Sequence, residues 1–166
     1  QIMRHSVGTA INCQSQRYVD MDDNFSIYIP PKAMENETLQ TYYKYYENSC
    51  KNHYKLVRRE LRNEGIEGEK ANDIMRTMLP IGVACNLTMG FTVEALINFM
   101  HKRLCVRADE PIRKVAQLMR KAVIEVEPRY ADLLIPQCVD KMYCPEKHSC
   151  GAYPSKEEVH KKIFGK

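Results

Sequence analysis

The sequence predicts an α+β protein in which long helices dominate and a mixed sheet completes the fold. A long segment after Asn36 repeats its apolar residues at helical spacing, and two further segments in the second half do the same. Short runs of β-forming residues lie between them, bounded by proline or glycine. The chain has 166 residues, which fits a single domain over residues 1–166.

In the first half we expect one strand and one long helix. Residues 1–18 are predicted to be a helix end that runs into a polar loop, and residues 25–30 a short strand that stops at a proline pair. The long helix begins at Asn36, a favourable N-cap residue, and ends at Gly65. Its apolar stripe consists of Leu39, Tyr42, Tyr46, Cys50, Tyr54, Val57 and Leu61.

The middle of the chain is predicted to hold a short helix followed by a buried strand. The helix covers about residues 69–79 and is stopped by Pro80. Residues 81–91 are largely apolar and end near a glycine, which is typical of a buried strand. The helix residues expected to face the core are Ala71, Ile74, Met75 and Met78.

Two more helices are predicted before a polar tail. Thr92 caps a helix that reaches about residue 104, and Asp109 caps the next, which has a proline in its first turn and ends before Pro128. From residue 137 the tail is polar, with no predicted element. The residues expected to face inward are Val93, Leu96, Ile97, Met100, Ile112, Val115, Ala116, Met119, Val123 and Val126.

The composition excludes a disordered chain but leaves the ligand class open. Hydrophobic residues make up 44% and charged residues 28%, and the formal net charge is +4, which suits small anions as well as nucleic acid. Basic residues do not alternate with aromatic ones, so we expect no nucleic-acid partner. No apolar run approaches the roughly 20 residues that span a bilayer. We therefore expect a cytoplasmic protein that does not bind a membrane.

The seven cysteines are an odd number, and several fall within predicted helices or strands, so reduced thiols are expected rather than a disulfide framework. In the tail, Cys138, Cys144 and Cys150 are spaced C-x5-C-x5-C, with His148 between the last two. Zinc sites usually contain a close C-x2-4-C pair, which this tail lacks. A polar loop with incidental thiols is the better interpretation, and no metal is expected.

Cationic and hydroxyl side chains gather near the start of the chain, at Arg4, His5, Ser15, Arg17 and Tyr18. Arginine forks and serine hydroxyls bind phosphate oxygens, so this stretch could hold a phosphorylated ligand. From the residues alone, surface ion pairs in a loop are the slightly better explanation.

Three more arginines stand downstream: Arg76, Arg103 and Arg107. For the last two, a favourable interaction with a helix C-terminus is the default explanation. The sequence contains no Walker loop, G-x-G-x-x-G, G-x-S-x-G or H-E-x-x-H motif.

Read in chain order, these pieces resemble the flavin-dependent thymidylate synthases. That family has an Arg-His-Arg motif, a spacer, and then Ser-x-Arg-Tyr; this chain has Arg4-His5-Ser6 and, later, Ser15-Gln16-Arg17-Tyr18. The family places an arginine shortly before Leu-Pro, as Arg76 stands here. Next in the family comes a helix that contains an asparagine, then an arginine, and then an "AQWEIR"-like run. This chain has Asn98, Arg103 and "RADEPIR" at 107–113 in the same order.

The resemblance implies a homotetrameric enzyme with one catalytic domain in the chain and the family's fold. The enzyme would methylate dUMP at C5, using FAD, with NADPH and methylenetetrahydrofolate as co-substrates. It implies Arg103 as the catalytic residue that contacts the uracil ring. The implied nucleotide-binding residues are Gln1, Arg4, Ser15, Gln16, Arg17, Arg76 and Arg103. The implied cofactor-binding residues are Arg4, His5, Ser6, Asn98 and Arg107.

The chain departs from the family pattern mainly among the implied flavin-binding residues. Ser6 replaces an arginine, Glu94 stands where a flavin-contacting arginine is usual, and the spacer is longer. We also expect the family's N-terminal part to be missing. Two alternatives stay open: a divergent relative that acts on another pyrimidine nucleotide such as UMP, or that adds a different one-carbon group, and a non-catalytic nucleotide-binding homologue.

Overall fold

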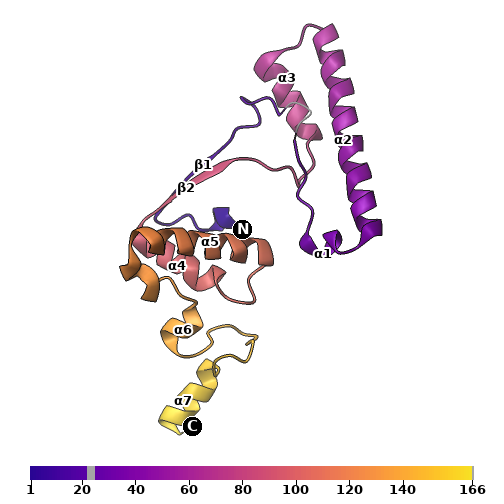
Figure 1. Ribbon diagram of the computed structural model, residues 1–166. Helices are drawn as coiled ribbons and strands as arrows, with labels where there is room; N and C mark the ends of the chain where they lie inside the picture. Colours follow the sequence, from indigo (N-terminus) through magenta and orange to yellow (C-terminus); the bar gives the residue numbers. More distant parts are fainter. Residues whose placement is uncertain (22–24, 166) are drawn as a thin grey trace. The chain divides into compact units, whose positions relative to one another are not determined.

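The computed structural model describes residues 1–21 and 25–165, shown as a ribbon in Figure 1. The chain divides into two compact units. Residues 1–11 and 89–166 belong to the first unit, and residues 12–88 to the second. Among the described residues, no helix combines the length and apolar character needed to cross a membrane.

The second unit is built around the long helix α2 (Glu37–Asn63), which α1 (Pro31–Met34) precedes and α3 (Gly68–Met75) follows. The Asn36 side chain accepts a hydrogen bond from the Leu39 backbone N–H at 3.0 Å, which confirms the predicted N-cap. A short 3₁₀ turn, η2 (Arg76–Met78), ends the helical segment before Pro80, as predicted.

The core of this unit uses only part of the predicted stripe. Tyr54 of α2 and Met75 of α3 are buried together with Phe25 and Ile27. The N-terminal apolar residues of α2, Leu39, Tyr42 and Tyr46, are instead exposed, as is Ile74 of α3. The helical period was predicted correctly, but the apolar side chains in the first turns of α2 are exposed in the described part of the chain.

The first unit packs α4 (Val93–Arg103) against α5 (Glu110–Val126). Its buried core is Phe99, Met100, Ile112, Ala116 and Leu134. The Thr92 side chain accepts a hydrogen bond from the Ala95 N–H at 3.2 Å and caps α4 as predicted. Three residues predicted to face inward are exposed: Val93, Val115 and Val126.

Four shorter helices complete this unit, and two of them lie in the tail that was predicted to have no element. They are η1 (Ile2–Arg4), η3 (Pro128–Asp132), α6 (Gln137–Lys141) and α7 (Lys156–Phe164). A complete capping box between Ser155 and Glu158 starts α7, a signal that the sequence contained.

The α+β, helix-rich class is confirmed, but the predicted mixed sheet is wrong for the described part of the chain. The sheet has two strands, β1 (Thr9–Cys13) and β2 (Leu87–Phe91). Backbone hydrogen bonds join Gly8 to Thr92 at one end and Gln14 to Asn86 at the other, so the strands are antiparallel. β1 lies where a polar loop was predicted.

The two predicted strands form less sheet in the structure than was predicted, for an identifiable reason. Residues 25–30 and 81–86 meet only around an isolated bridge between Ile27 and Val83. Prolines follow the first segment and precede the second, and a proline cannot donate to a ladder. Only the C-terminal half of the predicted strand 81–91 therefore remains a strand.

Candidate functional site

A polar cavity of about 350 Å³ lies in the first unit, between the N-terminal segment and α4. This volume is at the lower end of the range of small-molecule pockets, about 300–1,000 Å³. The lining residues are Arg4, His5, Ser6, Val7, Ala95, Asn98, Lys102 and Arg103. The cavity thus brings together five residues that the sequence predicted as nucleotide- or cofactor-binding, although nearly 100 positions separate the two segments.

The centre of this site is a contact between His5 and Arg103. The Arg103 Nε–H donates to His5 Nε2 at 2.9 Å, and an Arg103 Nη2–H donates to the Gln1 carbonyl oxygen at 3.4 Å. His5 is 9% exposed, and its ring meets that of Phe99 edge-on, with ring centroids 4.9 Å apart. A buried neighbour therefore fixes the ring, and the ring in turn orients the guanidinium.

The environment of His5 favours its neutral form. Burial lowers the pKa of His5 below its ordinary value, and the positive charges of Arg103 and Lys102 lower it further. A neutral imidazole has one nitrogen that accepts hydrogen bonds, and the Arg103 contact requires that nitrogen to be Nε2. His5 therefore acts here as a hydrogen-bond acceptor for Arg103.

This pKa gives a testable dependence of stability on pH. Because folding lowers the pKa of His5 from 6.5, the unfolded chain binds the proton more readily, so the free energy of unfolding should decrease as pH falls below about 6.5. Denaturant unfolding of wild type and His5→Gln between about pH 7.5 and 5.5 measures this contribution. We expect wild type to lose more stability than His5→Gln over this range.

The matched control for that experiment is His160→Gln, because His160 is an exposed histidine of α7. This variant should follow the wild-type pH profile. A His5→Gln profile identical to that of wild type would show that the fold does not favour the neutral imidazole.

The N-terminal segment reaches α4 through a close backbone approach at Gly8. Gly8 has a φ of +69°, and its carbonyl accepts a hydrogen bond from the Thr92 N–H at 2.8 Å. A Cβ at this position would lie 2.7 Å from Thr92 Oγ1 and 3.0 Å from Ala95 Cβ. Only glycine fits both the conformation and the space, and this packing holds residues 4–7 against the helix.

The charges that line the cavity suit an anionic ligand. Arg4, Lys102 and Arg103 contribute three cations, and no lining residue is acidic. The side chains of Ser6 and Asn98 add hydrogen-bonding groups. Glu94 is exposed near the start of α4 and is not among the lining residues, so its carboxylate does not oppose an anion there. The donor set therefore fits a phosphate-bearing group such as that of a flavin or pyrimidine nucleotide.

Lys102 is a functional candidate that the sequence reasoning missed. It follows Asn98 by four residues and Ala95 by seven, and all three line the cavity. Helical spacing from Asn98 would have identified it, because residues four apart share a helix face.

The predicted phosphate-binding loop lies in the second unit, on the surface of α3. The Asn72 side chain donates to the Arg17 carbonyl at 3.0 Å, and Ser15 Oγ accepts from the Arg17 N–H at 3.3 Å. Ion pairs join Arg17 to Glu69 and to Asp73, both at 3.8 Å. Loop and helix thus form one polar surface.

Arg76 completes this surface through an ion pair with Asp73 at 3.1 Å. Both arginine side chains are about half exposed. These contacts match the surface-ion-pair interpretation, and they also place Ser15, Arg17 and Arg76 within one cluster. An incoming phosphate would compete with the two carboxylates for the arginines.

The remaining predicted site residues lie elsewhere. The Gln1 side chain donates to Asp109 at 3.1 Å, so it ties the N-terminus to the start of α5. Tyr18 lies beneath the Arg17 guanidinium, whose central carbon is 5.5 Å from the ring centroid. Gln16 is half-buried in the same loop. Arg107 does not line the cavity with Arg103 and instead lines a second, thiol-rich cavity.

Comparison with known families identifies relatives of this chain. The family model described as thymidylate synthase complementing protein matches residues 1–129. This range includes every residue of the polar cavity and of the Arg17 loop.

Curated relatives named flavin-dependent thymidylate synthase occur in bacteria and archaea. The protein of Nitratidesulfovibrio vulgaris is 30% identical over 161 residues, which is 96% of this chain and 65% of the relative. The protein of Clostridium tetani is 32% identical over 171 residues, which is 96% of this chain and 67% of the relative. The protein of Sulfurisphaera tokodaii is 30% identical over 139 residues, which is 84% of this chain and 50% of the relative. The chain thus spans about half to two thirds of the length of these relatives.

A solved structure shares the fold. It is described as a UMP/dUMP methylase PolB from Streptomyces cacaoi bound with 5-Br dUMP. It superposes on this chain with a TM-score of 0.57 at 20% sequence identity, covering 75% of this chain and 59% of the other.

Proposed function

This chain belongs to the thymidylate synthase complementing protein family, and from that premise we propose that it is a flavin-dependent thymidylate synthase. It converts dUMP to dTMP, with methylenetetrahydrofolate as the carbon donor and NADPH as the reductant. In the overall reaction, dUMP, methylenetetrahydrofolate, NADPH and a proton give dTMP, tetrahydrofolate and NADP⁺. The observation that carries the proposal is the cationic cavity in which His5 orients Arg103.

Arg103 is the proposed catalytic residue. When C5 of the uracil ring forms its new carbon–carbon bond, negative charge develops on the ring, and a fixed guanidinium stabilises it. The hydrogen bond to His5 fixes the guanidinium before substrate arrives, so no reorganisation is needed during the reaction. C5 then loses its proton, tetrahydrofolate leaves the new carbon, and a hydride equivalent originating from NADPH completes the methyl group.

The cofactor proposed for this site is FAD, which supplies hydride chemistry between NADPH and the one-carbon unit. Arg4, His5, Ser6 and Asn98 line the cavity and are the side chains proposed to hold it, with Lys102 added by the structure. Arg107 remains a proposed contact from the family resemblance. The loss of an arginine at Ser6 is offset by Lys102, which brings a cation to the same cavity.

The nucleotide phosphate is proposed to bind the Arg17 loop, where Ser15, Gln16 and Arg76 accompany it. Gln1 and Arg4 are the other proposed nucleotide contacts. The active site is proposed to form within a homotetramer. The exposed aromatic side chains of α2, Tyr42, Tyr45 and Tyr46, support this assembly because a partner subunit could bury them.

Replacing Arg17 by alanine should weaken dUMP binding by about 1.5–3 kcal/mol, the cost of a lost hydrogen bond to a charged group. This corresponds to a Kd about 10- to 150-fold higher by isothermal titration. The structure motivates the test, because Arg17 is half exposed and its two carboxylate partners are 3.8 Å away, beyond the usual hydrogen-bond distance.

The matched control is Arg59→Ala, since Arg59 is an exposed arginine of α2 that pairs with Glu60. The Kd of this variant should equal that of wild type. An unchanged Kd for Arg17→Ala would leave Arg17 with surface ion pairs as its only role.

The proposed flavin use is tested by a visible absorption spectrum of the full chain incubated with FAD and freed of unbound cofactor. We expect a two-band flavin spectrum that bleaches on addition of NADPH. A protein that retains no FAD yet binds dUMP would favour the non-catalytic homologue.

A further inference from the structure

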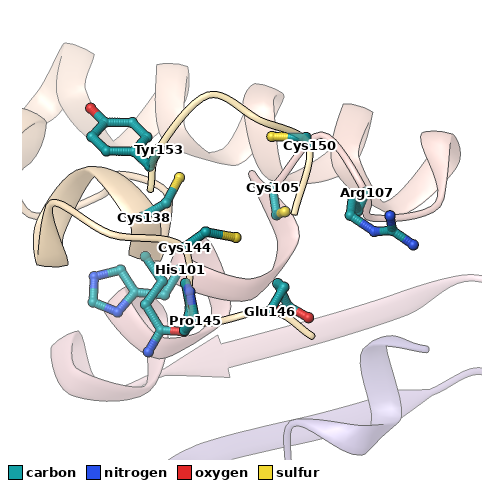
Figure 2. Close-up of a pocket in the computed structure, with 10 residues that line it drawn as sticks. His101, Cys105, Arg107, Cys138, Cys144, Pro145, Glu146, Cys150 and Tyr153 are labelled. Carbon is teal, nitrogen blue, oxygen red and sulfur yellow. The ribbon is translucent and has the colours of Figure 1, made fainter. Parts of the chain in front are cut away.

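A second cavity in the first unit is lined by an unusual number of thiols (Figure 2). Its volume is about 20 Å³, enough for a single ion or water molecule. Four of the seven cysteines line it: Cys105, Cys138, Cys144 and Cys150. All four are free thiols. Of the residues proposed to bind FAD or the nucleotide, only Arg107 lines this cavity.

The four thiols come from three separate parts of the chain. Cys105 stands in the turn after α4, Cys138 in α6, and the other two in the loop between α6 and α7. Figure 2 shows these four side chains arranged around one shared space. The tail spacing alone argued against a metal because it lacks a close cysteine pair. The fold supplies the missing thiol, Cys105, from 33 positions upstream of Cys138.

The tail around this cavity has little apolar burial to hold it in place. Between Met142 and Gly165, only Cys144 is buried, and α7 has no buried residue. The loop closes on itself where the Cys144 N–H donates to the Pro154 carbonyl at 2.7 Å. Small segments without a core usually need a disulfide or a metal to fix them.

We propose that Cys105, Cys138, Cys144 and Cys150 form a structural zinc site. Zn²⁺ prefers four tetrahedral sulfur or nitrogen ligands, and a set of four thiolates leaves no open position for catalysis. Among the described residues as they stand, no three metal-ligating groups are close enough to hold an ion, so the proposed site requires the thiols to move together when Zn²⁺ binds. The exposed Cys150 and the adjacent Gly151, with a φ of +87°, lie on the loop that would have to move.

One other side chain at the cavity, Arg107, fits this assignment, whereas Glu146 adds a carboxylate to the lining. Four thiolates around Zn²⁺ carry a net charge of −2, and the Arg107 cation lines the same cavity. His101 also lines it and is left out of the proposed ligand set; its Nε2 lies 4.0 Å from an Asp140 oxygen. The site would join the turn after α4 to the tail.

The test is the metal content of the full chain, produced without a histidine tag in zinc-supplemented medium and measured by mass spectrometry of the elements. We expect one Zn²⁺ per chain. Replacement by Co²⁺ should give the visible ligand-field bands of a tetrahedral thiolate site. Cys105→Ala and Cys150→Ala should each lose the metal and melt at lower temperature than wild type.

Two matched controls should keep the zinc. Cys85→Ala removes an exposed thiol of the other unit, and His101→Gln removes the nearby imidazole. Wild-type protein that contains no zinc and gives no Co²⁺ bands would overturn the proposal, whatever the variants do. Iron with inorganic sulfide, or a disulfide between any of these cysteines in freshly purified protein, would also overturn it. Loss of zinc in His101→Gln would overturn the four-thiolate ligand set.

Discussion

Replacing Arg103 by alanine is expected to lower kcat for dTMP formation by about 10²–10³-fold, the usual loss when a preorganised transition-state donor is removed. The Arg103 guanidinium lines the cationic cavity and donates to His5 at 2.9 Å. Because its charge is proposed to act where negative charge develops on the ring, the loss should appear in kcat more than in KM. Steady-state kinetics with dUMP as the varied substrate measure both constants.

Two companion variants separate this role from a structural one. Arg103→Lys keeps the cation but cannot reproduce the Nε–H donated to His5, so its kcat should lie between those of wild type and the alanine variant. Arg129→Ala removes an exposed arginine of the same unit and should leave kcat unchanged. Full activity in Arg103→Ala would show that this end of α4 does not contact the reacting ring. The oligomer of each variant is compared with wild type by light scattering.

Replacing Gly8 by alanine is expected to lower the free energy of unfolding by about 2–4 kcal/mol, from a left-handed backbone conformation and an overpacked contact together. The new Cβ would lie 2.7 Å from Thr92 Oγ1, the atom that caps α4 by accepting from the Ala95 N–H. Relief of the clash must move either the cap or the N-terminal segment. Urea unfolding of the full chain measures the loss.

Gly65→Ala is the matched control for the steric part of this effect. Gly65 has nearly the same φ, +73°, but nothing lies within 4 Å of its ideal Cβ. Its substitution should cost only about 1–2 kcal/mol, the conformational penalty alone. Equal losses in the two variants would show that the approach of Gly8 to α4 is not tight.

Helix starts were the most predictable part of the fold because capping is a local interaction. Asn36 and Thr92 both cap the helices predicted for them. Asp109 also stands at the start of its predicted helix, but its side chain accepts from Gln1 instead of capping the backbone. That choice depends on a residue 108 positions away, and no local pattern reveals it.

Strands were harder to predict because pairing partners decide them. Thr9–Cys13 has no apolar alternation to mark it, yet it becomes β1 through hydrogen bonds with β2. The more apolar residues 25–30 gain only one isolated bridge. Composition alone could not show which of these two segments forms a strand.

The site shows the same division between local and long-range information. The arginines and His5 were visible in the sequence, and the family resemblance gave them roles. The sequence could not show that Arg103 donates to His5, or that Arg17 and Arg76 share Asp73. Nor could it show that Cys105 joins the tail thiols, because each of these contacts requires the folded chain.

The most direct test of the proposed function is to detect dTMP by mass spectrometry after incubating the full chain with FAD, NADPH, methylenetetrahydrofolate and dUMP. A parallel reaction contains UMP in place of dUMP, and a third omits FAD. We expect dTMP from dUMP, little methylated product from UMP, and no product without FAD. Preferential methylation of UMP would identify a divergent methylase. If neither nucleotide is methylated by a chain that holds both FAD and dUMP, the proposed thymidylate synthase activity is wrong.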